Sequence, residues 1–290
     1  PEIVKPGGIA VSDSRIYISD GPGVKIYDLK SHRLLNQFGK KGEGPREFMV
    51  YPGHGVRVDF VRDRLIVNSL GKVFFYTESG EFKQELRTGK QMAFKYLDGL
   101  FVGNGFSMEK KINFQCLNLY DKDFKLVKSL HKWKHPIQDT AMSIDLAPEY
   151  MDTQVFGDRI YFTPDSTFRI LIYDKNGNKM KVILQPCERI AVDDGYRQRV
   201  LNFFKTDRRW KKNFELIKKI GKFKSHFPAI KMLLVDRHGI YVQTYRMEAG
   251  KSEFLFFNHD GKFKKKWMMP FHDTMGINIV PTHTIRDGKL

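Results

Sequence analysis

Residues 15–28 read Arg-Ile-Tyr-Ile-Ser-Asp-Gly-Pro-Gly-Val-Lys-Ile-Tyr-Asp, and both ends of this stretch return further along the chain. Copies of its first part occur at 64–67 (RLIV), 99–102 (GLFV), 159–162 (RIYF) and 239–242 (GIYV). Copies of its last part occur at 73–76 (VFFY), 117–121 (LNLYD), 170–174 (ILIYD) and 254–257 (FLFF). Short runs of β-branched and aromatic residues favour strands, and a fixed order that recurs indicates a repeated unit.

Turn residues follow the second strand of the pair in three of the copies. They read Glu-Ser-Gly at 78–80, Lys-Asn-Gly at 175–177 and His-Asp-Gly at 259–261. Glycine supplies the positive φ that a tight hairpin needs, so consecutive strands are expected to pair antiparallel. The sequence therefore predicts an all-β protein, a β-propeller of four-stranded antiparallel blades. With 290 residues the chain suits a single propeller domain over 1–290.

A sixth copy of the repeat begins near the end of the chain. Residues 281–290 (PTHTIRDGKL) match the opening of the first copy, residues 6–16. We therefore expect six blades, of which the last is incomplete in this chain. The ring is expected to be closed either by residues beyond Leu290 or by another strand, such as residues 1–5, because an open ring leaves unpaired strand edges.

Two intervals are too long for the repeat. Residues 131–152 contain two prolines and no strand pattern, so we expect a connector there. Residues 193–224 are expected to form one or two short helices, inserted between blades four and five. Their apolar residues recur at three- and four-residue steps, as Val200, Phe203, Phe204, Trp210, Phe214, Ile217 and Ile220. Asp193 and Asp194 are N-cap candidates, and Gly221 is a candidate stop.

The insert is also the most basic part of a basic chain. The whole chain carries a net charge of +17, which favours anionic partners such as nucleic acid, acidic glycan or anionic lipid. Residues 196–224 hold eleven basic and two acidic side chains, a local charge of +9. The candidate contacts for an anionic partner are Arg197, Arg199, Lys205, Arg208, Arg209, Lys211, Lys212, Lys218 and Lys219.

Three uses of this insert remain open. Its charges, with Tyr196, Phe203, Phe204 and Trp210 between them, are able to hold a phosphate backbone or acidic polymer and stack on its rings. Its apolar face is able to lie on an anionic membrane. Alternatively, the aromatic residues pack on the propeller while the charges face water. A second basic run, residues 262–267, is expected to be the solvated edge of an outer strand.

Metal and phosphate sites are weakly indicated. His54 and His283 precede the innermost strands of blades two and six, where zinc or calcium in a central channel would lie, but a third histidine at an equivalent position is missing. Calcium would otherwise use the strand ends Asp20, Asn68, Asn104 and Asp165, which more often cap turns. The glycines of residues 39–44 lack the context of a phosphate loop. We therefore expect no cofactor, and we expect Cys116 and Cys187 to be small buried residues rather than a disulfide.

Residues 38–48 (FGKKGEGPREF) resemble the Gly-x-x-Gly-x-Gly-Pro-Gly-Glu-Phe link of NHL-repeat proteins, with Arg46 where glycine is usual. Nearly the whole chain is similar to the bacterial 6-bladed β-propeller family. The resemblance implies a six-bladed ring, frequent export from the cell and usually no assigned activity. NHL-type propellers serve as protein-binding or RNA-binding platforms, and distant relatives are lyases and lactonases with a metal in the channel. Fold alone does not decide among these functions.

The sequence thus favours an exported bacterial propeller, not an enzyme, that binds a protein or another macromolecule or polymer, with nucleic acid as one option. The first alternative is a lyase or lactonase-type hydrolase that holds a metal with His54, His283 and nearby carboxylates. The second is a structural subunit of a larger assembly, whose neighbours complete the last blade. Residues 1–12 lack the pattern of a signal peptide, and no run of eighteen apolar residues occurs.

Overall fold

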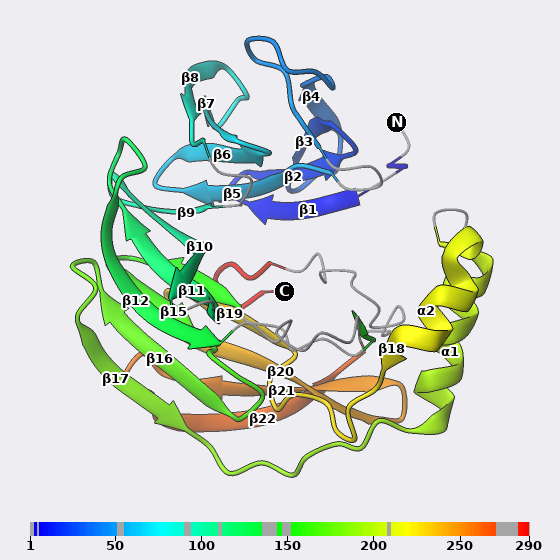
Figure 1. Ribbon diagram of the computed structural model, residues 1–290. Helices are drawn as coiled ribbons and strands as arrows, with labels where there is room; N and C mark the ends of the chain where they lie inside the picture. The colour runs from blue at the N-terminus through cyan, green and yellow to red at the C-terminus, as the bar shows by residue number, and fades with distance from the viewer. Residues whose placement is uncertain are drawn as a thin grey trace.

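Five four-stranded blades form the body of the protein (Figure 1). The computed structural model describes residues 3–4, 6–50, 55–89, 94–109, 112–134, 144–146, 152–207, 210–270 and 284–289. In every blade the strands pair antiparallel in the order of the sequence. The first strand of each blade lies toward the middle of the ring and the fourth on its outside (Figure 1). The molecule is therefore a β-propeller, as the repeat predicts.

The strand bounds follow the repeat closely. Blade one consists of β1 (Pro6–Val11), β2 (Arg15–Asp20), β3 (Gly23–Asp28) and β4 (Leu34–Phe38). Blade two consists of β5 (Arg57–Val61), β6 (Arg64–Ser69), β7 (Lys72–Thr77) and β8 (Phe82–Arg87). Blade three consists of β9 (Phe94–Leu97), β10 (Leu100–Glu109), β11 (Ile112–Tyr120) and β12 (Leu126–Lys134). Blade four consists of β14 (Thr153–Phe156), β15 (Arg159–Phe162), β16 (Arg169–Asp174) and β17 (Lys179–Leu184). Blade five consists of β19 (Met232–Asp236), β20 (Gly239–Glu248), β21 (Lys251–Phe257) and β22 (Phe263–Met269).

The core lies between the faces of neighbouring blades. Tyr17 and Ile26 of blade one pack with Leu65 and Phe74 of blade two, and all four side chains are fully buried. Burying one such side chain contributes about 1.5–3 kcal/mol. The outermost strands are exposed instead. The basic run at 262–267 leads from the preceding turn into β22, and its lysines face water as expected. Of the two cysteines, Cys116 is buried, whereas the prediction for Cys187 is wrong because it is exposed.

The glycine-rich link between blades one and two is a structural turn. Phe48 is fully buried between the two blades, and its N–H donates to the carbonyl oxygen of Lys40 at 2.9 Å. Gly39 has φ +91°, and a Cβ there would lie 2.4 Å from Cε2 of Phe48. Arg46 adopts φ +59°, the left-handed conformation that glycine takes more easily. Its guanidinium lies 4.4 Å from the ring centre of Phe82, a contact that glycine would lack.

Five complete blades, rather than the expected six, are present among the described residues. The C-terminal segment 284–289 lies between blade five and blade one and forms one hairpin turn, in which Arg286 pairs with Lys289. Asp287 and Gly288 have φ of 53° and 72°, and the turn after β5 has the same left-handed pair in Arg62–Asp63, at 47° and 62°. No strand of the expected sixth blade is present among the described residues. Residues 3–4 lie outside the strands.

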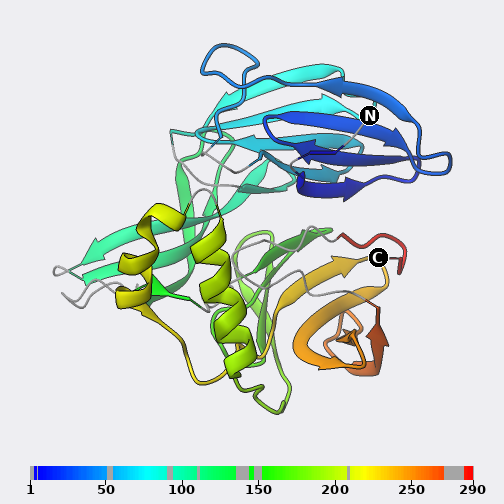
Figure 2. The ribbon, with the colours of Figure 1, turned by 90° about the vertical axis from the view of Figure 1, so that its right-hand side faces the viewer.

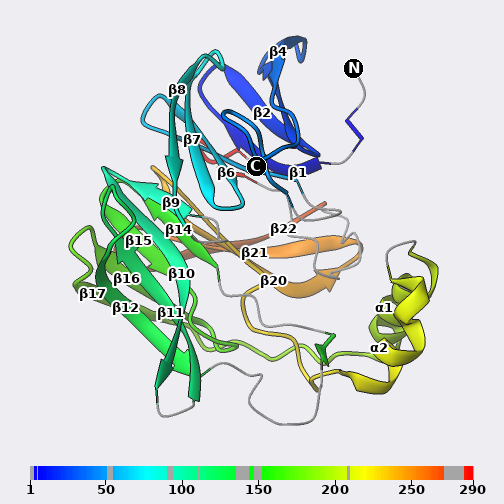
Figure 3. The ribbon, with the colours of Figure 1, turned by 45° about the horizontal axis from the view of Figure 1, so that its top comes forward.

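The insert between blades four and five is helical, as predicted. It contains α1 (Asp194–Thr206), the 3₁₀ turn η1 (Lys211–Asn213) and α2 (Phe214–Ile220). Asp193 caps α1, because its Oδ1 accepts the N–H of Tyr196 at 2.6 Å, and Gly221 follows α2. Figure 2 shows the two helices side by side, and Figure 3 shows them at the edge of the ring opposite β12 and β17.

The insert has a small core of its own. Val200 of α1 and Ile217 of α2 pack with Phe227 and with Tyr245, which belongs to β20. A short parallel pair, β13 (Ile144–Asp145) with β18 (Gly221–Lys222), also ties it to the segment between blades three and four. The prediction that 131–152 has no strand is therefore wrong, because β12 runs to Lys134 and β13 lies at 144–145.

Candidate functional site

A cavity of about 340 Å³ opens where the ends of the innermost strands converge, and we call it the channel-mouth cavity. Each blade contributes the last residues of its first strand or the turn that follows, and the C-terminal segment completes the wall. Its polar lining residues are Asp13, Asp59, Lys95, Tyr96, Gln154, Asp236, Arg237, Thr284, Arg286 and Asp287. A concave site with several converging polar groups is where a small ligand is most often held.

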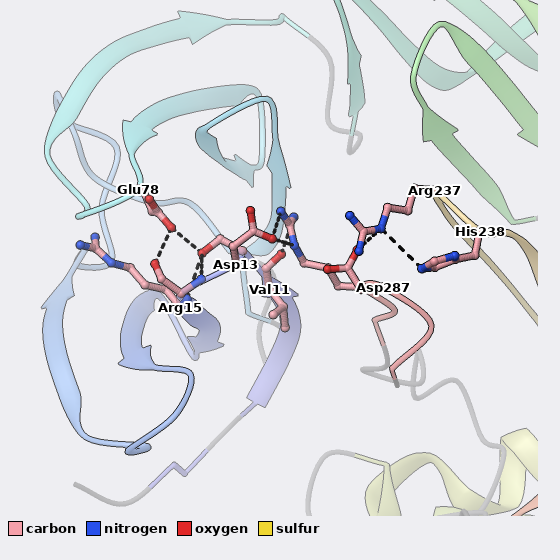
Figure 4. Close-up of polar contacts among 10 residues, drawn as sticks. Val11, Asp13, Arg15, Glu78, Arg237, His238 and Asp287 are labelled. Atoms are coloured by element: carbon pink, nitrogen blue, oxygen red, sulfur yellow. Dashed lines mark hydrogen bonds and ion pairs between the residues drawn. The ribbon is translucent and has the colours of Figure 1, made fainter.

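Ion pairs between blades join most of the charges in the cavity. Lys95 of blade three donates to both carboxylate oxygens of Asp59 in blade two, at 2.8 and 3.0 Å. On the opposite side Arg286 donates to Asp13 of blade one through two nitrogens, at 2.9 and 2.7 Å. Arg237 of blade five lies 2.7 Å from Asp287 (Figure 4). Every cation of the wall is thus already matched by a carboxylate.

Two further carboxylates hold the blades in place around this cavity. Asp236 is buried and accepts the N–H of Gly288 at 2.7 Å, which fixes the C-terminal turn to blade five. Glu78 of blade two accepts the hydroxyl groups of Ser12 and Ser14 in the first turn of blade one (Figure 4). The hydrogen bond from Ser12 is the main cause that lowers the pKa of Glu78. These contacts position the wall instead of facing a ligand.

Asp152 provides a similar tie between blades four and five. Its Oδ2 accepts the N–H of the buried Leu233 at 2.9 Å, and its Oδ1 accepts Nε2 of Gln154 at 3.1 Å. Burial of the carboxyl group raises its pKa. A carboxyl with a raised pKa beside a cavity is a candidate acid or base. Here both oxygens are engaged in holding blade five and Gln154, so the structural role explains it.

Apolar rings form the remainder of the cavity wall. Phe60 stacks on Tyr17 with ring centres 5.2 Å apart, and Phe156 stacks on His259 with ring centres 5.6 Å apart. Tyr96 is held by edge contacts with neighbouring rings of blade three and blade two. The rings are therefore fixed by the blades behind them, while they line the cavity.

The predicted contact residues of the basic insert fall into three groups in the structure. Arg197 pairs with Asp194 at 3.2 Å, and the Arg199 guanidinium lies 6.0 Å from the ring centre of Tyr196. Five lysines are exposed and form no ion pair within the described ranges, namely Lys205, Lys211, Lys212, Lys218 and Lys219. The remaining two, Arg208 and Arg209, lie outside the described residues.

The aromatic residues of the insert differ from the stacking hypothesis. Tyr196 and Phe204 are buried in the core of the insert, so their faces are closed to a nucleotide base. Trp210 is 42% exposed and is the most accessible of the four rings that the sequence suggested. Most of the apolar face of the helices therefore packs on the protein itself, although Leu216 is 49% exposed in addition to Trp210.

The predicted metal ligands do not come together in the described part of the structure. His54 and His283 lie outside the described residues. Asp20 pairs with Lys25 at 2.6 Å, Asn68 accepts the N–H of Phe94 at 2.8 Å, and Asp165 accepts the N–H of Thr167 at 2.9 Å. Asn104 is exposed in β10. Among the described residues no group of three or more histidine, cysteine, aspartate or glutamate side chains is able to hold a metal.

Sequence reasoning missed the channel-mouth residues. The partners come from different blades, with Asp59 and Lys95 36 residues apart and Asp13 and Arg286 273 residues apart. A signal was nevertheless present, because the charged residues lie in or just after the first strand of a copy of the repeat. Aligning the copies by that strand would have brought these positions together before the structure was known.

One known structure supports the fold. No family model matches the chain, and none of the curated proteins matches it. A Bacteroides fragilis protein, provisionally described as exported, is similar over 93% of this chain and 72% of its own, with 15% identity and a TM-score of 0.55. A Bacteroides caccae protein of unknown function gives 10% identity and a TM-score of 0.49 over 93% and 84% of the two chains. A DUF4221 family member from Bacteroides vulgatus gives 8% and 0.46 over 92% and 82%. At such identities the likeness concerns the fold alone.

Proposed function

We propose that the protein is a non-catalytic binding or scaffold propeller that engages an anionic macromolecule or polymer through its basic helical insert. One observation carries the proposal. Lys205, Lys211, Lys212, Lys218 and Lys219 are exposed and outside any ion pair of the described residues, while most apolar residues of the same helices are buried or partly buried in the core of the insert. Such an arrangement leaves charge, rather than apolar surface, available to a partner.

The size of the local charge supports the same reading. Residues 196–224 contribute +9 to a chain total of +17, and the helices stand at the edge of the ring (Figure 3). A cluster of like charges on one surface raises the local concentration of an oppositely charged polymer and speeds its association with the protein. Because Tyr196 and Phe204 are buried, affinity is expected to come from charge, with Trp210 as the most exposed ring among the described residues of the insert.

Binding of a fluorescent heparin oligosaccharide and of a single-stranded RNA of similar length tests the proposal. Both probes are measured over a range of salt concentrations. We expect log Kd to rise linearly with log salt, and the slope to fall by about 0.7–0.9 for every charge contact removed. In a variant with Lys211, Lys212, Lys218 and Lys219 changed to glutamate, affinity at low salt is expected to fall by at least about tenfold.

A matched control separates the insert from the overall charge. Lys179→Glu, Lys181→Glu, Lys262→Glu and Lys264→Glu change the net charge equally on exposed positions of blades four and five. The control is expected to keep the affinity within about threefold, because its lysines lie outside the insert. Equal losses in both variants, or no binding of either probe at low salt, would refute the proposal.

We also infer that the protein is one six-bladed domain of the NHL-like type over 1–290, and that it is exported. The left-handed hairpin at Asp287–Gly288 supports a sixth blade, because the first two strands of blade two are joined by the same kind of turn. The similar Bacteroides fragilis protein, provisionally described as exported, supports export. A crystal structure of the protein as its cell produces it tests the first inference, and cell fractionation tests the second. A closed five-bladed ring, or protein confined to the cytosolic fraction, would overturn them.

A further inference from the structure

We propose that the channel-mouth cavity is a binding site for a neutral, polyhydroxylated ligand, a monosaccharide or disaccharide. The site is separate from the basic insert and goes beyond the function proposed for it. Its volume of about 340 Å³ lies within the range of about 300–1,000 Å³ that small-ligand pockets occupy. At about 30 Å³ for each water, it holds the space of roughly eleven waters, which is room for a substituted six-membered ring.

The charges in the wall favour a neutral ligand. Lys95 is paired with Asp59, Arg237 with Asp287 and Arg286 with Asp13, with 2.7–2.8 Å between the paired nitrogen and oxygen atoms. A charged ligand would compete with the partner that each of these side chains already has. An uncharged ligand leaves all three pairs in place.

The pairs also present the pattern that hydroxyl groups complement. Each pair places donors beside an acceptor, as in Arg237 next to Asp287 (Figure 4). A hydroxyl has one donor hydrogen and two acceptor lone pairs. Two neighbouring hydroxyls on a sugar are therefore able to donate to the carboxylate and accept from the guanidinium at the same time. A ligand with only hydrogen-bond donors or only acceptors would form hydrogen bonds with one member of each ion pair and not with the other.

Two polar groups of the wall are free to take part. The hydroxyl of Tyr96 and the side-chain oxygen of Gln154 have no hydrogen-bond partner in the described part of the protein, and both residues are partly exposed. Gln154 is oriented by its Nε2, which donates to Asp152 at 3.1 Å. Its oxygen is thus the acceptor that remains for a ligand in the cavity.

The rings supply the apolar half of a sugar site. Phe60 and Phe156 line the cavity, and each is stacked on a neighbouring ring; the Arg286 guanidinium lies 6.0 Å from the ring centre of Phe60. A sugar ring has an apolar face made of C–H groups and an equatorial edge made of hydroxyls, and aromatic surface buries the first while ion pairs bind the second. The cavity combines both surfaces within one wall, which a site for a metal ion or a simple anion would not need.

Saturation-transfer NMR on the full chain with neutral hexoses, N-acetylhexosamines and their disaccharides tests the proposal, followed by calorimetry on each sugar that binds. We expect at least one of them to bind with an affinity that does not change with salt. Gln154→Ala is expected to weaken that binding at least about tenfold, the loss of one hydrogen bond of about 1.4 kcal/mol. Tyr96→Phe keeps the ring and is expected to weaken it several-fold. Lys264→Glu on β22 is the control and is expected to bind as the unaltered protein does.

Three outcomes would overturn the proposal. One is that no neutral sugar in the panel binds. Another is that binding is unaffected by both Gln154→Ala and Tyr96→Phe. The third is that a neutral sugar binds but its affinity falls steeply as salt rises, contrary to the expected independence of salt. If Gln154→Ala lowers the melting temperature, Tyr96→Phe decides the question, because it removes the hydroxyl alone. None of these results depends on whether the insert binds heparin.

Discussion

Replacing Asp152 tests how blades four and five are held together. In Asp152→Ala the N–H of Leu233, in a fully buried residue, loses the carboxylate oxygen that accepts it at 2.9 Å, and Gln154 loses its acceptor at 3.1 Å. A buried donor without a partner costs about 1–3 kcal/mol, and the partly exposed Gln154 costs about 1 kcal/mol because water replaces its partner. We expect the free energy of unfolding to fall by about 2–4 kcal/mol.

Asp152→Asn separates the acceptor from the charge. Asparagine still accepts the N–H of Leu233, and Gln154 is able to turn its amide and keep the second bond. Burial raises the pKa of Asp152 above its ordinary value of 3.8, so the folded protein holds this proton to higher pH than the unfolded chain does. The stability contributed by the protonated group is therefore complete below the ordinary pKa, and is lost as the pH rises through the raised one.

Urea denaturation of the three proteins at pH values from 4 to 8 measures both effects. We expect Asp152→Asn to match the unaltered protein at the acid end, and to become equally or more stable than it toward pH 8, because asparagine does not titrate. Asp152→Ala is expected to be less stable throughout. If Asp152→Asn at neutral pH loses as much as Asp152→Ala, the ionised carboxylate is the stabilising form and the reasoning is refuted.

Two further predictions concern the turns and the insert. Gly39→Ala is expected to lower the free energy of unfolding by about 2–4 kcal/mol, because the new Cβ would lie 2.4 Å from Phe48 at φ +91°. The control Gly21→Ala, at φ +59° with nothing within 4 Å, should lower it by about 1 kcal/mol. Equal losses of the two variants in urea denaturation would contradict this prediction. Asp193→Ala removes the cap whose Oδ1 accepts the N–H of Tyr196 at 2.6 Å, so α1 should lose about 1 kcal/mol of local stability; hydrogen exchange measures it, and unchanged protection in the first turn would exclude the cap.

The blades could be predicted from sequence because their determinants are local. Residues 15–18 and 25–28 fall in β2 and β3, and the four later copies of each fall in the corresponding strands except for Gly99 and Asp121, which lie just outside them. The caps of the insert were also readable, with Asp193 before α1 and Gly221 after α2. The end of β12 was missed because its alternating basic and apolar residues continue into a segment with prolines, without a turn signal.

The candidate sites were less accessible to sequence reasoning. Charge alone located the basic insert, but spacing did not show that Tyr196 and Phe204 are buried. Helical periodicity shows which residues share a face, and it does not show what that face packs against. The channel-mouth pairs depend on which blade ends meet, and Asp59 meets Lys95 only after blades two and three have packed. Such convergence is a property of the ring rather than of any one repeat.

Closure of the ring has a consequence for the order in which the chain folds. Within a blade the strands are hairpins of neighbouring residues, whereas the contact of Arg286 with Asp13 spans 273 residues. Closing a loop of this length is slow. We therefore expect the blades to form first and this contact to form late in folding. Arg286→Ala should therefore leave the refolding rate unchanged and speed unfolding by at most about fivefold, because an exposed ion pair contributes about 0–1 kcal/mol.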